Sequence, residues 1–111
     1  MRMKLTLFVA LTMAILVTGC AHDLTLVPRG GGNKGAGVAK ELGQSVQIEI
    51  NGKVYYGNYV FGGGSAVSGK GRILVTSPDG DAIRCEFQYD ISGIGTCHDS
   101  SGKEYDLQIH N

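Results

Sequence analysis

The sequence predicts an all-β domain: an antiparallel hairpin meander of about six to eight short strands, rolled into a small barrel or sandwich. From Gln44 onward, apolar residues alternate with polar ones with a period of two, and no stretch shows the spacing of an amphipathic helix. Residues typical of tight turns separate the alternating segments, most clearly at Asn51-Gly52 and at Ser77–Gly80. Period-two segments joined by short turns are the pattern of antiparallel strands.

The first predicted hairpin turns at Asn51-Gly52. Both turn positions need a positive φ, which Asn and Gly accept most readily. Residues 46–50 alternate before this turn, and a two-residue loop places Ile48 opposite Tyr55 and Val46 opposite Gly57.

Further strands follow at regular intervals along the chain. Ser77-Pro78-Asp79-Gly80 joins a strand over Arg72–Thr76 to one over Ala82–Tyr89. Turns at Asp90–Ser92 and Asp99–Gly102 lead to a last strand in which Tyr105, Leu107 and Ile109 alternate with polar residues.

Cys85 and Cys97 are predicted to form a disulfide. If they lie opposite each other, Asp90–Ser92 is a three-residue loop, Phe87 faces Gly95 and Tyr89 faces Gly93, so that an aromatic ring covers each glycine. A domain this small buries little apolar surface, and a disulfide is a common way to stabilise it. Metal binding is disfavoured because there is no CxxC motif, and adjacent residues of a strand, such as Cys97 and His98, point to opposite faces.

A glycine-rich phrase recurs in the hairpins. It reads Gly69-x-Gly71 followed by Gly80-x-x-Ile83, and Gly93-x-Gly95 followed by Gly102-x-x-Tyr105, with a half copy in the segment GKVYYGNY at residues 52–59. This phrase resembles the MORN repeat, a β-hairpin unit, over about residues 52–109. The resemblance implies an alternative architecture, an extended sheet of stacked hairpins.

One face of the predicted sheet is strongly apolar and needs a cover. Rolling the sheet up would cover it, and so would docking of another protein. The face comprises Tyr55, Tyr59, Ile73, Val75, Ile83, Phe87, Tyr89, Tyr105, Leu107 and Ile109.

Residues 1–19 have the features of an export signal. Met1–Lys4 carry two positive charges, Leu5–Val17 are mostly apolar, and the run is too short to span a bilayer. The tetrad Val17–Cys20, VTGC, resembles the lipobox of bacterial lipoproteins. That resemblance implies cleavage after Gly19 and lipidation of Cys20, which holds the protein on a membrane in the envelope. With Ala21 as the next residue it implies the outer membrane, on the periplasmic side, rather than the inner membrane or the cell surface.

Residues 20–33 are interpreted as the lipidated cysteine and a flexible tether, and residues 34–111 as a single small β domain. Pro28 and the glycines Gly30–Gly32 favour a tether that reaches about 20 Å. The apolar stretch Leu24–Val27 leaves a second possibility open, in which it docks as an edge strand.

Charge and motifs disfavour several classes of function. The part from Cys20 onward carries eight Lys and Arg against ten Asp and Glu, a net charge of −2, which argues against nucleic-acid binding. Neither cofactor nor metal motifs occur, and Cys97-His98-Asp99 does not converge as a nucleophile pair requires, so we expect no enzyme. Two classes remain: a non-catalytic binding or envelope-assembly module for a protein or glycan, and an inhibitor of a hydrolase such as lysozyme, presenting the loop Ser65–Ser68.

Overall fold

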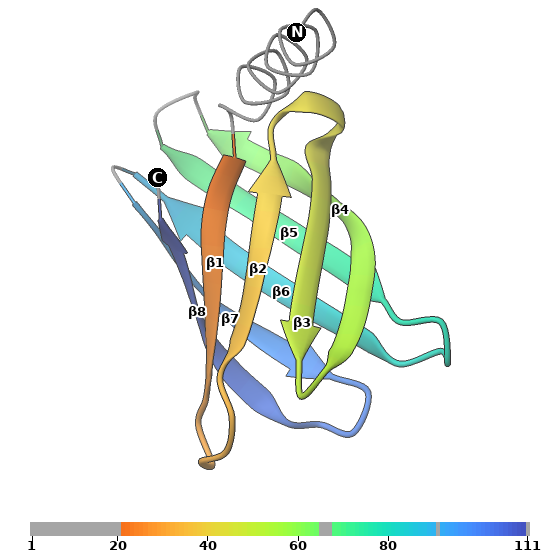
Figure 1. The fold of residues 1–111 in the computed structure, drawn as a ribbon. Helices are drawn as coiled ribbons and strands as arrows, with labels where there is room; N and C mark the ends of the chain where they lie inside the picture. The colour runs from red at the N-terminus through yellow and green to blue at the C-terminus, as the bar shows by residue number, and fades with distance from the viewer. Residues whose placement is uncertain (1–20, 65–67, 91, 111) are drawn as a thin grey trace, which may run out of the picture.

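Residues 21–64, 68–90 and 92–110 are described by a computed structural model, and they form a closed antiparallel β-barrel of eight strands (Figure 1). Consecutive strands are neighbours throughout, and the last strand returns to pair with the first. The strands are β1 (Ala21–Pro28), β2 (Gly35–Lys40), β3 (Ser45–Ile50), β4 (Lys53–Gly64), β5 (Gly69–Thr76), β6 (Ala82–Tyr89), β7 (Gly93–Asp99) and β8 (Glu104–His110), with a short 3-10 turn, η1 (Leu42–Gln44), between β2 and β3.

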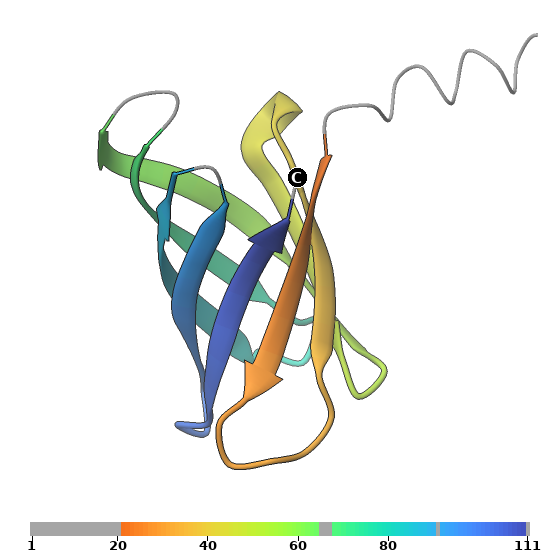
Figure 2. The same ribbon diagram turned by 90° about the vertical axis from the view of Figure 1, so that its left-hand side faces the viewer.

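Pairing of β1 with β8 closes the barrel. Leu24 lies opposite Ile109 and Leu26 opposite Leu107, and Figure 2 shows the two strands side by side. Closure removes both free sheet edges and turns the apolar face inward. The prediction of a small all-β barrel is therefore confirmed, and the described strands do not adopt the alternative of an extended sheet.

The hairpin register predicted from the turn residues is also confirmed. Asn51 and Gly52 have φ angles of 55° and 79°, as a tight turn of this type requires. Ile48 pairs with Tyr55, and Val46 pairs with Gly57.

The interpretation of residues 20–33 as a flexible tether is wrong for Ala21–Pro28. These residues form β1, which pairs with β2 on one side and with β8 on the other. The strand forms because Leu24 and Leu26 point into the barrel, where they are 2% and 0% exposed. Burying these two side chains stabilises the strand, and a solvated tether would leave them in water. The barrel thus begins at Ala21 and not at Lys34, and β1 is a closing strand rather than an edge strand.

The disulfide between Cys85 and Cys97 is present, and it links β6 to β7 inside the barrel. The two Cα atoms are 4.0 Å apart and both side chains are buried. Phe87 pairs with Gly95 as predicted, but the predicted cover of Gly95 by its ring is wrong. The Phe87 ring lies over Gly71 on β5, and a Cβ on Gly95 would first meet the Glu86 carbonyl oxygen.

The predicted cover of Gly93 by the Tyr89 ring is wrong, although the two residues do pair. A Cβ on Gly93 would meet Ile109, its partner on β8, at 2.8 Å. The Tyr89 hydroxyl instead lies over Gly69, its partner on β5. Each glycine in a closed barrel has a neighbour on both sides, and here Ile109 fills the space over Gly93.

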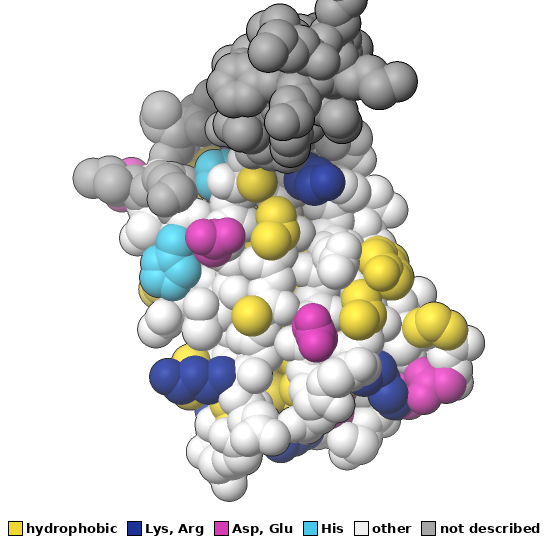
Figure 3. Space-filling model, viewed as in Figure 1, with side chains coloured by type: hydrophobic (Ala, Val, Ile, Leu, Met, Phe, Trp, Pro, Cys, Tyr) yellow, Lys and Arg dark blue, Asp and Glu magenta, His cyan; other side chains and the backbone are white. Residues whose placement is uncertain are grey.

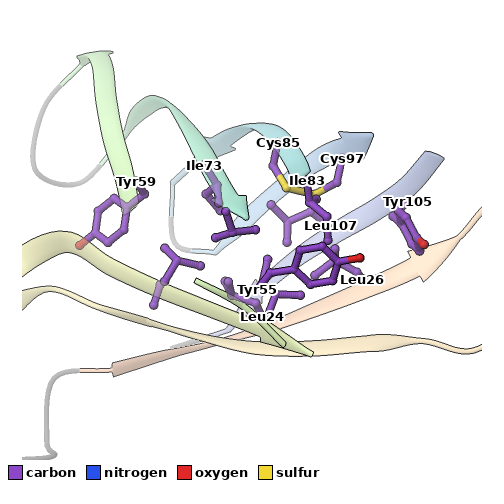
Figure 4. Packing of buried hydrophobic residues seen from close by; sticks show 14 of the residues in the cluster. Leu24, Leu26, Tyr55, Tyr59, Ile73, Ile83, Cys85, Cys97, Tyr105 and Leu107 are labelled. Carbon is purple, nitrogen blue, oxygen red and sulfur yellow. A yellow bond between two sulfur atoms is a disulfide. The ribbon is translucent and has the colours of Figure 1, made fainter. Parts of the chain in front are cut away.

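The two ends of the barrel differ in how they are filled. The start of β1 and the end of β8 lie at one end of the barrel, here called the mouth, together with residues 41–44, the end of β4 and the start of β7 (Figures 1 and 2). The other, closed end carries the turns at 29–34, 51–52, 77–81 and 100–103. In Figure 4, Tyr55, Tyr105, Leu26, Leu107 and the disulfide crowd together, whereas Tyr59 stands apart from them, toward the mouth.

Ion pairs lie at the closed end. The Arg29 guanidinium donates to Glu104 at 2.7 Å and to Asp106 at 2.9 Å. Lys53 pairs with both Asp79, at 2.9 Å, and Asp81. These side chains are partly exposed, so each pair contributes little to the free energy of unfolding. Their effect is to make this end of the barrel strongly polar.

Candidate ligand cavity

A cavity of about 950 Å³ opens at the mouth of the barrel. This volume is within the range of sites that bind small molecules, and an eight-stranded barrel has room inside for packed side chains or for one small ligand. The apolar side chains that line it are Leu24, Ala39, Tyr59, Phe61, Ile73, Phe87, Tyr89 and Ile109, and its polar side chains are His22, Glu41, Gln44, Asp90 and Ser92.

Four aromatic rings from β4 and β6 form one wall of this cavity. The Phe61 ring centroid lies 5.4 Å from Tyr59, 6.5 Å from Phe87 and 5.2 Å from Tyr89. Tyr59 and Phe87 are buried, whereas Phe61 is 53% exposed at the rim. Rings with edge-to-face and tilted contacts present a firm apolar surface on which an aliphatic or aromatic ligand can pack.

Glycines on β5 leave room for two of these rings. A Cβ on Gly71 would overlap with the Phe87 ring, and a Cβ on Gly69 would lie 2.8 Å from the Tyr89 hydroxyl. Only glycine on β5 therefore lets these rings lie close to the sheet. The β4 register shifts between Phe61 and Gly63, a bulge that bends the end of this strand at the mouth.

A polar pair lies at the rim of the cavity. The His22 Nε2 atom is 2.9 Å from Glu41 Oε1, so in a neutral ring the proton is on Nε2 and Nδ1 is an acceptor. Nδ1 is buried and has no hydrogen-bond partner within the described part of the chain. A buried acceptor without a donor is unfavourable by about 1–3 kcal/mol, so His22 offers a place for a donor from a ligand.

The charges that line the cavity are all negative. Glu41 and Asp90 are both acidic, and the described lining residues include no Lys or Arg. Burial raises the pKa of Tyr59 above its ordinary value, and the nearby Glu41 carboxylate raises it further, so this hydroxyl stays protonated at neutral pH. The electrostatic environment favours a cationic or hydrogen-bond-donating group and disfavours an anion.

A second hollow, of about 680 Å³, lies on the outer wall over β1–β4. This is the face seen in Figure 3, where hydrophobic side chains lie scattered among polar ones. The hollow lies over the small residue Ala36, and its lining includes acidic Glu49 and basic Lys40. Its charges are mixed, and it has no aromatic wall like that of the mouth.

The chain matches no family model, no curated protein and no solved structure. The resemblances to the lipobox and to the MORN repeat therefore stay expectations from the sequence.

The residues that the sequence singled out do not come together in one site. Cys20 lies outside the described residues, as do residues 65–67 of the loop expected for a hydrolase inhibitor. Cys97 is inside the barrel and disulfide-bonded, whereas His98 is on the outside, 3.5 Å from Glu104. Asp99 accepts hydrogen bonds from the backbone of its own turn at Ser101 and Lys103.

No group of three or more His, Cys, Asp or Glu side chains in residues 21–64, 68–90 and 92–110 is placed to hold a metal ion. Over the same ranges, no helix has the length and apolar character needed to cross a bilayer.

The cavity itself was not predicted from the sequence. Tyr59, Phe87 and Tyr89 were expected on the apolar face, but Phe61 was not. His22 and Glu41 were not expected to meet. One signal was available: glycines at residues 62–64, 69, 71, 93 and 95 gather near the same end of three strands, β4, β5 and β7. Such a cluster leaves one end of a barrel without side chains to fill it.

Proposed function

We propose that this protein is a non-catalytic binding module, anchored at the outer membrane by lipid on Cys20, whose barrel binds an amphiphile. The apolar body of the ligand lies against the aromatic wall, and a hydrogen-bond-donating, positively charged head lies at His22 and Glu41. The observation that carries this proposal is the mouth cavity of about 950 Å³, which combines an apolar wall with a purely acidic set of charges.

The energetics of such a ligand are favourable. Burying five methylene groups against the aromatic wall contributes about 4 kcal/mol. A donor to the unpartnered Nδ1 atom of His22 relieves an unfavourable buried acceptor. An ammonium head also gains from Glu41, whereas a carboxylate head meets repulsion from the same side chain.

Binding is tested on the chain from Ala21 to Asn111, since β1–β8 close the barrel within this span. The chain contains no tryptophan, so Phe61→Trp places a single fluorescent reporter at the rim of the cavity. Titration with decylammonium is expected to shift the tryptophan emission to shorter wavelength. Decanoate, with the same chain length and the opposite charge, is expected to bind at least tenfold more weakly.

Blocking the cavity provides the matched comparison. Ala39 lines the cavity and is 7% exposed. Val38, the residue before it in β2, points to the outside of the barrel and is 36% exposed. In the reporter background, Ala39→Phe is expected to weaken decylammonium binding more than tenfold, and Val38→Phe is expected to leave it unchanged. Thermal unfolding of both variants verifies that they fold.

Three results would contradict this proposal: no emission shift with any decyl amphiphile, tighter binding of decanoate, or equal effects of the two Phe substitutions. The anchor is tested separately by mass spectrometry of the native N-terminus. Cleavage after Gly19 with a lipid mass on Cys20 is expected, and an unmodified Cys20 would refute the membrane assignment.

A further inference from the structure

We propose that the mouth of the barrel rests against the bilayer, with Leu42, Phe61 and Ile94 in the interface, so that the amphiphile passes between the membrane and the cavity without crossing water. This inference rests on the proposed function for its ligand and its anchor. It assigns an orientation and an interaction surface, and the partner is a lipid bilayer.

The position of β1 is the first observation. Ala21 is the first residue of β1 and lies at the mouth end of the barrel (Figure 1). Adjacent Cα atoms of a trans peptide are 3.8 Å apart, so a lipid on Cys20 is attached next to the mouth. Because Ala21–Pro28 are paired in the barrel, they provide no spacer that could hold the mouth away from the headgroups.

The distribution of exposed apolar side chains is the second, independent observation. Leu42 in η1 is 86% exposed, Ile94 near the start of β7 is 67% exposed, and Phe61 near the end of β4 is 53% exposed. All three belong to the mouth end. Water-exposed Leu, Ile and Phe at the end that carries the anchor are placed to enter the boundary between headgroups and acyl chains.

The outer wall has exposed apolar residues as well, but it lacks the other features of a membrane surface. Val38, Tyr56, Val60 and Leu74 are exposed on β2, β4 and β5. Their side chains point outward from the side of the barrel and do not line the mouth cavity. This set provides wall positions for matched controls.

The closed end has the opposite character. None of the large hydrophobic residues that are exposed in the described ranges lies in its turns. It carries instead the ion pairs of Arg29 with Glu104 and Asp106, and the pairs of Lys53. The mouth carries the acidic Glu41 and Asp90 as well, so the exposed Leu42, Phe61 and Ile94 are what distinguish it from the closed end as the end to face a bilayer.

The ligand route follows from this orientation. The cavity lining reaches the rim at Phe61, which is both part of the aromatic wall and one of the exposed apolar residues. An amphiphile leaving the bilayer at this point would pass from acyl chains onto the ring of Phe61. Its head would reach Glu41, which also lines the cavity and directly precedes Leu42.

The test uses the full lipidated protein in vesicles of phosphatidylethanolamine and phosphatidylglycerol. One cysteine is introduced and labelled with an environment-sensitive fluorophore: Leu42→Cys at the mouth, Leu74→Cys on the wall or Lys34→Cys at the closed end. The native thiols are engaged, since Cys85 and Cys97 form a disulfide and Cys20 carries the lipid. Lipids with a nitroxide on the acyl chain are expected to quench the label at position 42 at least threefold more strongly than at 74 or 34. Equal quenching at the three positions, or strongest quenching at 74 or 34, would overturn the inference.

A second comparison separates the apolar rim from the anchor. With the label on Phe61→Cys, the pair Leu42→Ser and Ile94→Ser is expected to reduce quenching at least twofold, while Val38→Ser and Leu74→Ser on the wall leave it unchanged. No reduction by the rim pair would refute the contribution of these side chains. The binding titration in the absence of vesicles is independent of both measurements, so a barrel that binds decylammonium but turns its mouth to water contradicts only the orientation.

Discussion

Removing the disulfide should destabilise the barrel by an amount that the structure allows us to work out. Cys85 and Cys97 are separated by 12 residues, and closing a loop of that size in the unfolded chain corresponds to about 3 kcal/mol in the chain-entropy model. Both cysteines are buried, at 2% and 0% exposure, so replacing them by alanine also leaves two small voids of about 1 kcal/mol each. We therefore expect Cys85→Ala with Cys97→Ala to lower the free energy of unfolding by about 5 kcal/mol, a large share for a domain of this size.

Urea unfolding followed by circular dichroism measures this loss. The matched control is the wild-type protein with its disulfide reduced, which keeps both sulfur atoms. The reduced protein should lose about 3 kcal/mol, so the difference between the two samples isolates the packing contribution. A loss below about 1 kcal/mol in the double variant would refute the reasoning, because it would mean that the cross-link constrains neither the unfolded chain nor the core.

Two further substitutions test the closed end and the barrel wall. The hydrogen bond from Ser77 is the main cause that lowers the pKa of Asp79 to about 2 from 3.8, so the stabilisation is present above about pH 4 and is lost as the pH falls toward 2. Asp79→Asn should flatten this acid dependence of the urea midpoint between pH 5 and pH 2, and an unchanged slope would contradict the assignment. A Cβ on Gly57 would overlap with the Leu74 carbonyl oxygen, so Gly57→Ala should lower the free energy of unfolding by about 3 kcal/mol, whereas Gly30→Ala, where a Cβ meets no atom within 4 Å, should change it little. Equal melting temperatures of the two alanine variants would contradict this expectation, because they would mean that β4 and β5 can move apart at Gly57 without loss of stability.

The turn residues and the cysteine pair made two of the hairpins predictable from the sequence. Asn51-Gly52 dictates a turn with two positive φ angles, and this one constraint fixes every partner in the β3–β4 pair. The register of β6 and β7 followed in the same way from the requirement that Cys85 face Cys97. In both cases the determining residues are close in sequence, so the number of possible pairings is small.

The pairing of β1 with β8 was harder to predict from the sequence. β1 joins β8 through contacts such as Leu26 with Leu107, which no turn residue connects. Its alternating segment is short, and Pro28 and the following glycines are equally typical of a tether. The cavity depends on the same closure, because Leu24 on β1 and Ile109 on β8 both line it and are partners across the closing pair.

Chemical-shift mapping tests most directly whether the mouth cavity is the binding site. Adding decylammonium to ¹⁵N-labelled protein spanning Ala21 to Asn111 should move the amide resonances of Leu24, Tyr59 and Ile109 along a saturating curve. The turn at Asn51 at the closed end should stay unchanged. Saturating shifts at the closed end or on the outer wall, with the mouth unaffected, would contradict the account.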